Sequence, residues 1–436
     1  MKAATRLPQT VGGAVFAAVL AITFLPSGAR DAIADSSGSA GLPDRLADYS
    51  YLTGNVSSSP PGRAIATYQH GYGVEMMDFP QAIAVAADGD IYRRVDLAES
   101  RGGPETQGDA GPSRLSPDGT RTVVGQYVVR APNLVVLELD TGRRTRHPVP
   151  GGSSAVPLAW SPDSTLVAYL TTAEPINQYP RTALRGEIGV LDTETGAARL
   201  LPGPVDARAA AFSPDGAQLA IHRIGPDDGS PSDPDALPRQ TGGVIDIVDL
   251  DGTSDRQVTV PGHLSLDGPA AWSPDGALLA VVVRAGGGGG IAFLDASGAD
   301  GPVPEPLPSE VTGWHGVLGW TGPREVLVMD GDPSSEDPHD DLYWLTALSL
   351  DGGEPRPLSA VPGGGNYGVG DFQVATGLLA DLEIRAAGKV DRGPWPGPLR
   401  FGTAVVIGGL ALVVARIVVQ RRDRTRPSAP PASPVQ

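Results

Sequence analysis

The stretch Ala271-Trp272-Ser273-Pro274-Asp275-Gly276-Ala277-Leu278-Leu279-Ala280-Val281-Val282 decides the fold, because versions of it recur along the chain. It reads as a short strand ending in an aromatic residue, a Ser-Pro-Asp-Gly turn and a second, hydrophobic strand. Proline presets φ in such a turn, aspartate bonds the turn backbone, and glycine adopts a positive φ without steric cost. Two strands joined so closely run antiparallel.

The repeats of this unit are spaced like the blades of a propeller. Strong copies lie at Leu115-Ser116-Pro117-Asp118-Gly119, Trp160-Ser161-Pro162-Asp163-Ser164 and Phe212-Ser213-Pro214-Asp215-Gly216. Weaker copies lie at Ala86-Ala87-Asp88-Gly89 and Trp320-Thr321-Gly322-Pro323. From Ser116 to Thr321 the successive turns are roughly 45 to 60 residues apart, near the ~40–50 residues of a propeller blade.

A second landmark follows each of these turns. An apolar strand runs into an Asp-containing turn that ends at Gly142, Gly196, Gly252, Gly298 or Gly352, and a short segment closing on proline comes next. Each unit therefore contains four strands, which predicts an all-β chain.

These units resemble the WD40-like repeat of TolB-type β-propellers, in which an aromatic-Ser-Pro-Asp-Gly turn joins the first two strands of a blade. The resemblance covers roughly Pro80 to Pro362 and implies a propeller fold and a scaffolding role in a cell envelope. The closing Trp-Asp of standard WD40 repeats is missing. No N-terminal α/β domain of the TolB family is evident, so a coupling to transport does not carry over. Propellers host unrelated activities, so the resemblance predicts fold better than function.

The number of blades depends on how the ring closes. Between Asp88 and Ser116 the chain is too short for a full unit, whereas Phe372 to Ile384 reads as one more hairpin with nothing after it. A blade shared between the two ends of the chain would use both fragments and leave no open edge. We therefore expect about six blades over residues 63–388, with seven as the alternative.

Residues 1–34 have a basic start, an apolar core and an Ala-x-Ala site, which predicts a secretory signal peptide. An uncleaved anchor is the alternative. The Ser-, Gly- and Pro-rich residues 35–62 predict a flexible linker with one short strand near residues 49–52.

The C-terminal region predicts a membrane anchor. Residues 389–400 read as a juxtamembrane linker, 401–420 as a transmembrane helix and 421–436 as a short basic, then Pro-rich, cytoplasmic tail. Four arginines follow the apolar segment, so the positive-inside rule places the propeller on the extracytoplasmic side of the membrane. The expected topology is single-pass.

Composition excludes several classes of function. The chain of 436 residues has no cysteine and a net charge of −17, which rules out thiol chemistry and argues against nucleic acid as a partner. It contains no Gly-x-Ser-x-Gly elbow, no His-Glu-x-x-His and no phosphate-binding loop with lysine. We therefore expect no catalytic residues and no organic cofactor.

Two sets of acidic residues stand out in the sequence, one in a single acidic stretch and one in the repeated turns. In the stretch 330–341, oxygen ligands alternate as calcium prefers, and Asp330, Asp332, Glu336 and Asp341 are the candidate ligands of a calcium loop. The stretch lacks the glycine and the final glutamate of an EF-hand loop. The turn aspartates Asp118, Asp163, Asp215 and Asp275 recur in every strong unit, which indicates a structural role.

Three functions fit this organisation. Insertions at 171–185, 223–242 and 330–341 all follow the second strand of a unit, so they should cluster on one face and bind a protein or envelope component. A calcium-assisted propeller enzyme of the lactonase or sugar dehydrogenase type is the first alternative. Small apolar inner strands such as Val156 to Ala159 and Ala209 to Ala211 argue against it. A sensor that works with a membrane partner is the second.

Overall fold

The structure is a computed structural model. It describes residues 40–424 except 72–79, 103–108, 128–131, 173–185, 203–205, 224–241, 252, 263, 267, 286–287, 299–300, 310–315, 332–341 and 363–368. The described chain falls into two units, a large one of residues 40–51 and 55–391 and a small one of 52–54 and 392–424.

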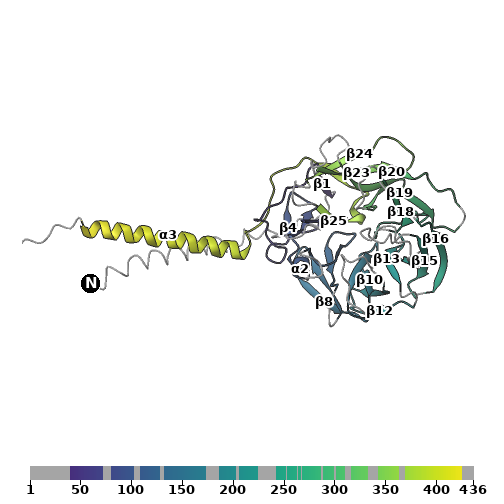
Figure 1. Cartoon of the computed structure of the whole chain (residues 1–436), viewed down its shortest axis with the longest axis horizontal. Coiled ribbons are helices and arrows are strands. Elements are labelled where there is room, and N and C mark those ends of the chain that lie inside the picture. Colours follow the sequence, from purple (N-terminus) through teal and green to yellow (C-terminus); the bar gives the residue numbers. More distant parts are fainter. Residues whose placement is uncertain are drawn as a thin grey trace, which may run out of the picture. The chain divides into compact units, whose positions relative to one another are not determined.

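The large unit is a propeller of six four-stranded antiparallel blades around a central axis, which confirms the expected fold class (Figure 1). Blades 2 to 6 each use one continuous stretch of chain, with strands in sequence order across the sheet. Blade 2 contains β5 (Ser113–Leu115), β6 (Arg121–Val124), β7 (Asn133–Glu138) and β8 (Arg144–Pro148). Blade 3 contains β9 (Val156–Trp160), β10 (Leu166–Thr171), β11 (Glu187–Asp192) and β12 (Ala198–Leu200).

The next three blades repeat this order. Blade 4 contains β13 (Ala207–Phe212), β14 (Gln218–Arg223), β15 (Gly243–Asp249) and β16 (Ser254–Val260). Blade 5 contains β17 (Leu264–Ser265), β18 (Leu278–Ala285), β19 (Gly288–Asp295) and β20 (Leu307–Ser309). Blade 6 contains β21 (Gly319–Gly322), β22 (Glu325–Gly331), β23 (Leu342–Ser349) and β24 (Arg356–Pro362).

Blade 1 is the composite blade that closes the ring. Its innermost strand is β25 (Val369–Val374), followed by β2 (Ala64–His70), β3 (Gln81–Ala86) and β4 (Tyr92–Arg94). The sharing of a blade between both ends of the chain is thus confirmed, but the expected hairpin over Phe372 to Ile384 is wrong. After β25 the chain forms the 3-10 turn η2 (Thr376–Leu378), and β26 (Glu383–Arg385) pairs in parallel with β1 (Gly41–Pro43). The N-terminal segment offers β26 a partner outside the blade, so no second blade strand forms.

The described part of the expected linker is packed against the propeller. Ala40, Leu42 and Leu46 are at most 4% exposed and join the core formed by blades 1 and 6. Arg45 bridges Ala360 of β24, and residues 51–52 form a turn where a strand was expected. Serine and glycine content suggested flexibility, but these apolar side chains bury enough surface to hold the segment in place.

Neighbouring blades are joined by the tryptophans that precede the turns. The Trp160 indole donates to the Arg114 carbonyl (2.9 Å), that of Trp272 to Ala211 (3.2 Å) and that of Trp320 to Ala270 (3.0 Å). Each bond reaches the inner region of the preceding blade. Tryptophan suits such a contact between blades, because its large apolar ring packs well and its buried indole N–H finds an acceptor.

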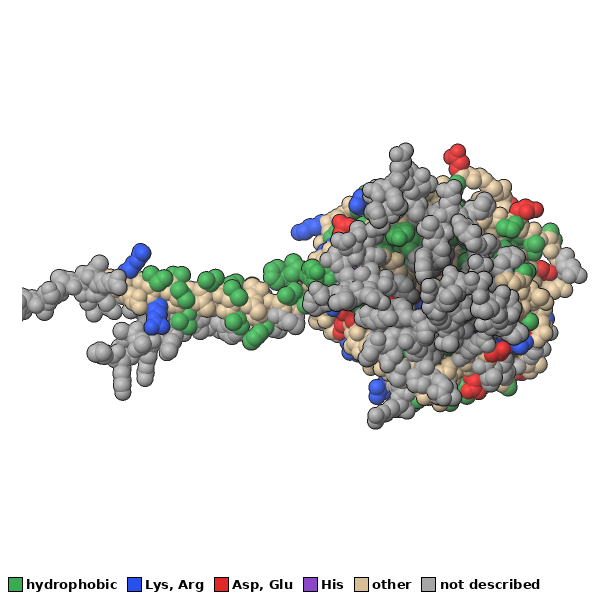
Figure 2. All heavy atoms as spheres, in the orientation of Figure 1, with side chains coloured by type: hydrophobic (Ala, Val, Ile, Leu, Met, Phe, Trp, Pro, Cys, Tyr) green, Lys and Arg blue, Asp and Glu red, His purple; other side chains and the backbone are tan. Residues whose placement is uncertain are grey.

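Among the described residues, two α-helices lie outside the blades. The short helix α2 (Asp96–Glu99) connects blades 1 and 2. In the small unit, α3 (Gly397–Arg424) contains the segment Leu399–Val418, which has a mean hydropathy of 2.2 and is long and apolar enough to cross a membrane. Figure 2 shows apolar side chains along α3 and basic ones near its end. Residues 1–34, predicted to be a signal peptide, lie outside the described residues.

Candidate functional site

The two faces of the propeller are built differently. Connections between the first and second strands, and between the third and fourth, leave from one face, here called the turn face. Connections between the second and third strands, and between successive blades, leave from the other, here called the loop face. The three predicted insertions join β10 to β11, β14 to β15 and β22 to β23, so the strands that carry them all end at the loop face. Their interiors lie outside the described residues.

The turn aspartates bond within their own turns on the turn face. In all four, the aspartate Oδ1 accepts the hydroxyl of the preceding serine at 2.5 to 2.6 Å and a backbone N–H two residues later at 3.0 to 3.1 Å, as seen for Asp118, Asp163, Asp215 and Asp275. The serine Oγ in turn accepts a hydrogen bond from the backbone N–H at the start of the second strand. In blade 5, the Leu278 N–H donates to the Ser273 Oγ at 2.9 Å. Hydrogen bonds from Ser213 and Ala217 hold the pKa of Asp215 below its ordinary value. These contacts explain the four aspartates structurally.

Of the four candidate calcium ligands, the described residues include Asp330 alone. Asp330 pairs with Trp344 as part of β22, whereas Asp332, Glu336 and Asp341 lie outside the described residues. The calcium loop therefore stays a prediction. Among the residues that the structure does describe, no three acidic or histidine side chains are grouped as a metal would require.

A charged pair on the innermost strands was missed by sequence reasoning. Arg114 of β5 and Asp371 of β25 approach to 3.3 Å between Nη1 and Oδ1. Arg114 also donates to the carbonyls of Ser113 (2.8 Å) and Leu158 (3.1 Å), so it ties together the inner strands of blades 1, 2 and 3. The Gln373 side chain completes the cluster by bonding both Ser113 and Leu115.

Asp371 has two unusual properties. Its φ is +46°, a conformation that aspartate tolerates better than most residues. Burial raises the pKa of its carboxyl, although the charge of Arg114 and a bond from Gln373 oppose that shift. Yet 35% of its side chain stays accessible to solvent. A carboxyl group beside a guanidinium can orient a polar ligand through hydrogen bonds.

The inner strands of blades 1 and 2, for which the sequence analysis made no prediction, are therefore not purely apolar. The expectation of small, apolar inner strands applies to β9 and β13, where Ala159 and Ala210 are buried. The pair was hard to find because Asp371 and Arg114 lie far apart in sequence and only the composite closure brings them together. The one available signal was an acidic residue directly before the last strand pattern, Asp371 next to Phe372.

Comparisons with known proteins concern the fold. No family model and no curated protein matches the sequence. Similar solved structures include hydrazine synthase of Kuenenia stuttgartiensis (18% identity, 57% of this chain and 66% of that one, TM-score 0.39) and TolB of Acinetobacter baumannii (16%, 70% and 68%, 0.42). An oligogalacturonate lyase in complex with manganese is also similar (15%, 72% and 77%, 0.41). The chain spans about two thirds of the first two structures. Similarity at this level assigns neither a ligand nor a reaction.

Proposed function

We propose that this protein is a membrane-anchored scaffold whose propeller binds a protein or another cell-envelope component through its loop face. One observation carries the proposal: the three long insertions all leave from strand ends on the same face, whereas most connections on the opposite face are short turns. Loops held by a rigid ring are the usual place for recognition, because their sequence can vary without cost to the fold.

The anchor is α3. Its apolar segment of 20 residues is close to the length that spans a bilayer. Arg421, Arg422 and Arg424 follow this segment, and Arg426 comes two residues after Arg424 in the sequence. Basic residues next to a span stay on the cytoplasmic side, which would leave the propeller on the extracytoplasmic side.

The topology can be tested by cysteine labelling, because the chain has no cysteine of its own. We would place one cysteine in the exposed β11–β12 turn (Glu194→Cys) and, in a second variant, one in the tail (Ser428→Cys). A membrane-impermeant maleimide should label position 194 in intact spheroplasts and position 428 only after permeabilisation. The reverse pattern, or release of the protein without detergent, would contradict the anchored topology.

The partner can be sought with the full chain purified in detergent. Envelope membrane proteins would be incubated with the purified chain, with and without calcium, and the proteins that it retains would be identified. A matched variant would have residues 224–241 replaced by a short Gly-Ser linker. We expect a partner that the wild type retains and the variant loses, while both unfold at the same temperature. A partner retained equally by variants of all three insertions would contradict recognition by the loop face.

The pair Arg114 and Asp371 favours one other candidate, an enzyme or small-molecule binder that uses the channel. Asp371→Asn keeps the size and the tolerated backbone conformation but removes the charge. If the protein acts as a scaffold, this variant and the wild type should capture the envelope partner equally. Loss of a co-purifying small molecule from this variant alone would favour the channel candidate.

A further inference from the structure

The outer strands of the blades differ in whether their free edges are covered. The N-terminal segment bridges β4 through Asn55 and β24 through Arg45, and Asp391 covers β4 from the C-terminal side. For β8, β12, β16 and β20, no such bridge exists among the residues that the structure describes. These four strands present open backbone edges, which proteins usually protect with charges.

Each described arginine on an outer strand is bonded to a neighbour, with one exception. Arg93 pairs with Asp391, Arg94 with Glu99 and Arg356 with Glu325. Arg199 and Arg256 donate to the carbonyls of Leu250 and Ser297. Arg146 of β8 makes no hydrogen bond or ion pair with any described residue, and its side chain is exposed. β8 is also the one uncovered edge that carries two exposed arginines, at alternate positions 144 and 146.

A third guanidinium lies beside them without an acidic partner. Arg101, which follows α2, donates to the carbonyls of Val124 (3.1 Å) and Asn133 (3.4 Å) and to the Asn133 side chain (2.7 Å). Burial, together with the positive charges of Arg146 and Arg144, lowers its pKa to about 10. Three arginines thus lie near one another here, with Asp96 as the acidic partner of Arg144, in a chain whose net charge is −17.

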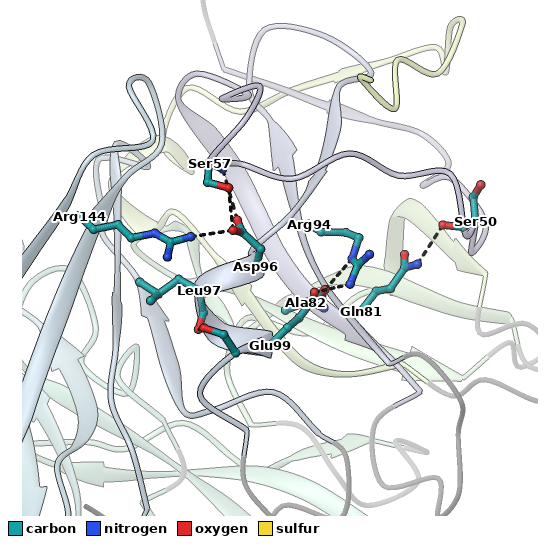
Figure 3. A network of polar contacts seen from close by, with 10 residues as sticks. Ser50, Ser57, Gln81, Ala82, Arg94, Asp96, Leu97, Glu99 and Arg144 are labelled. Carbon is teal, nitrogen blue, oxygen red and sulfur yellow. Dashed lines mark hydrogen bonds and ion pairs between the residues drawn. The ribbon is translucent and has the colours of Figure 1, made fainter. Parts of the chain in front are cut away.

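These charges are spread along the strand and do not converge on one point. The Arg144 guanidinium is turned toward Asp96 of α2, at 2.6 Å (Figure 3). Arg101 is engaged with blade 2 backbone near the other end of β7, and Arg146 lies between them in register, opposite Val135. A single small oxyanion would not reach all three groups, whereas an elongated anionic ligand would.

We propose that the open edge of β8 is a docking site for an acidic, extended peptide segment of a partner protein. Side chains at alternate positions of a strand lie about 6.5 to 7 Å apart, and an added strand has the same repeat. Carboxylates at alternate positions of such a peptide would thus face Arg144 and Arg146 as cross-strand pairs. A second copy of this strand is a less favourable occupant, because several registers would place arginine opposite arginine. The site is separate from the loop face and does not depend on the membrane topology.

The test uses the full chain in detergent and fluorescein-labelled ten-residue peptides that alternate glutamate with threonine, read by fluorescence anisotropy. The glutamate peptide should bind, and its glutamine counterpart should not. Arg146→Gln should weaken binding about two- to five-fold, the range of one cross-strand charge pair. Arg146→Lys should retain most of it, and Arg146→Glu should weaken it more than Arg146→Gln does.

The matched control is Arg356→Gln on β24, a strand whose edge is covered, and it should leave binding unchanged. Because Arg146 is exposed, its variants should unfold at the wild-type temperature. Equal binding of the glutamine peptide, or an equal loss in Arg356→Gln, would overturn the proposal. It would also be overturned if inorganic polyphosphate or anionic lipid vesicles bind with the same Arg146 dependence while the peptide does not.

Discussion

Blade 4 and blade 1 have the same four-stranded sheet but are held together differently. In blade 4, β13 and β14 are joined covalently by Ser213-Pro214-Asp215-Gly216. In blade 1, β25 and β2 come from opposite ends of the chain and no turn joins them. The turn of blade 2 substitutes for it: Gly119 O accepts the Ala64 N–H at 2.7 Å, and Pro117 O accepts the Gly377 N–H at 2.9 Å.

The difference shows that one short motif has two uses. In blade 4 the turn closes a hairpin between residues close in sequence, which costs little chain entropy. In blade 2 the same motif also holds the two chain ends against each other, across about 300 residues of intervening chain. Damage to blade 1 should therefore affect the whole ring, whereas damage to the blade 4 turn should stay local.

The largest effect is expected for Phe372→Ala in β25. Phe372 is 5% exposed and stacks on Tyr68 of β2 with ring centroids 5.5 Å apart. Its removal leaves a cavity that should lower the free energy of unfolding by about 3–5 kcal/mol. Chemical denaturation measures this loss, and hydrogen exchange should show increased opening of β2.

The matched control is Phe212→Ala in blade 4, where the phenylalanine is 4% exposed. A loss of similar size is expected, but hydrogen exchange in β2 should stay at the wild-type level. If both variants open β2 equally, the composite blade is not the weak point of the ring.

The second prediction compares Gly119→Ala with Gly216→Ala. Both glycines have a positive φ, +71° and +72°, so alanine should cost about 1–2 kcal/mol of backbone strain in either turn. A Cβ at Gly119 would lie 2.1 Å from the Ala64 carbonyl oxygen, whereas at Gly216 the nearest atom would be 3.6 Å away. Gly119→Ala should therefore cost about 3 kcal/mol or more, because the clash pushes β2 away from the closure. Equal losses in urea denaturation would contradict this assignment.

Sequence reasoning predicted the repeats and the blade shared between the two chain ends, but it missed the side-chain contacts within that closure. The Ser-Pro-Asp units fix local hairpins by turn chemistry, so blades 2 to 5 were predictable from residues such as Asp118 and Asp275. The inner pair of Arg114 and Asp371 joins strands distant in sequence, and no local pattern reports such a contact. The burial of Leu42 and Leu46 was hidden because their segment is short and surrounded by residues typical of linkers.

The third prediction concerns pH and compares Asp215 of blade 4 with Asp371 of blade 1. The pKa of Asp215 is lowered in the fold, so its ionised form contributes stability above about pH 4 that is lost as pH falls through the folded pKa. Asp215→Asn should cost about 1 kcal/mol at pH 7 and less at pH 3. The pKa of Asp371 is raised, so the fold binds the extra proton and loses stability as pH rises from about 4 through the folded pKa.

The effect of Asp371→Asn on the free energy of unfolding should accordingly have the opposite trend. Relative to the wild type, this variant should be more stable at pH 7 than at pH 3. Denaturation of both variants and the wild type at several pH values between these limits measures the two slopes. Slopes of the same sign would show that the carboxyl of Asp371 is not held in the environment described above.

The smallest effect is expected in the turn of blade 3, where Ser164 stands in place of glycine. Its φ is +61°, and its Oγ accepts the N–H of Asp118, within the closure turn of blade 2, at 3.1 Å. Ser164→Gly should relieve about 1 kcal/mol of backbone strain and lose a hydrogen bond of about the same value, so its stability should change by less than about 0.5 kcal/mol. Ser164→Ala keeps the strain and loses the bond, so it should cost about 1 kcal/mol. Amide exchange at Asp118 should rise in both variants, because both remove its acceptor. An unchanged exchange rate would mean that contacts within the blade 2 turn protect the Asp118 amide and that the hydrogen bond to blade 3 does not contribute.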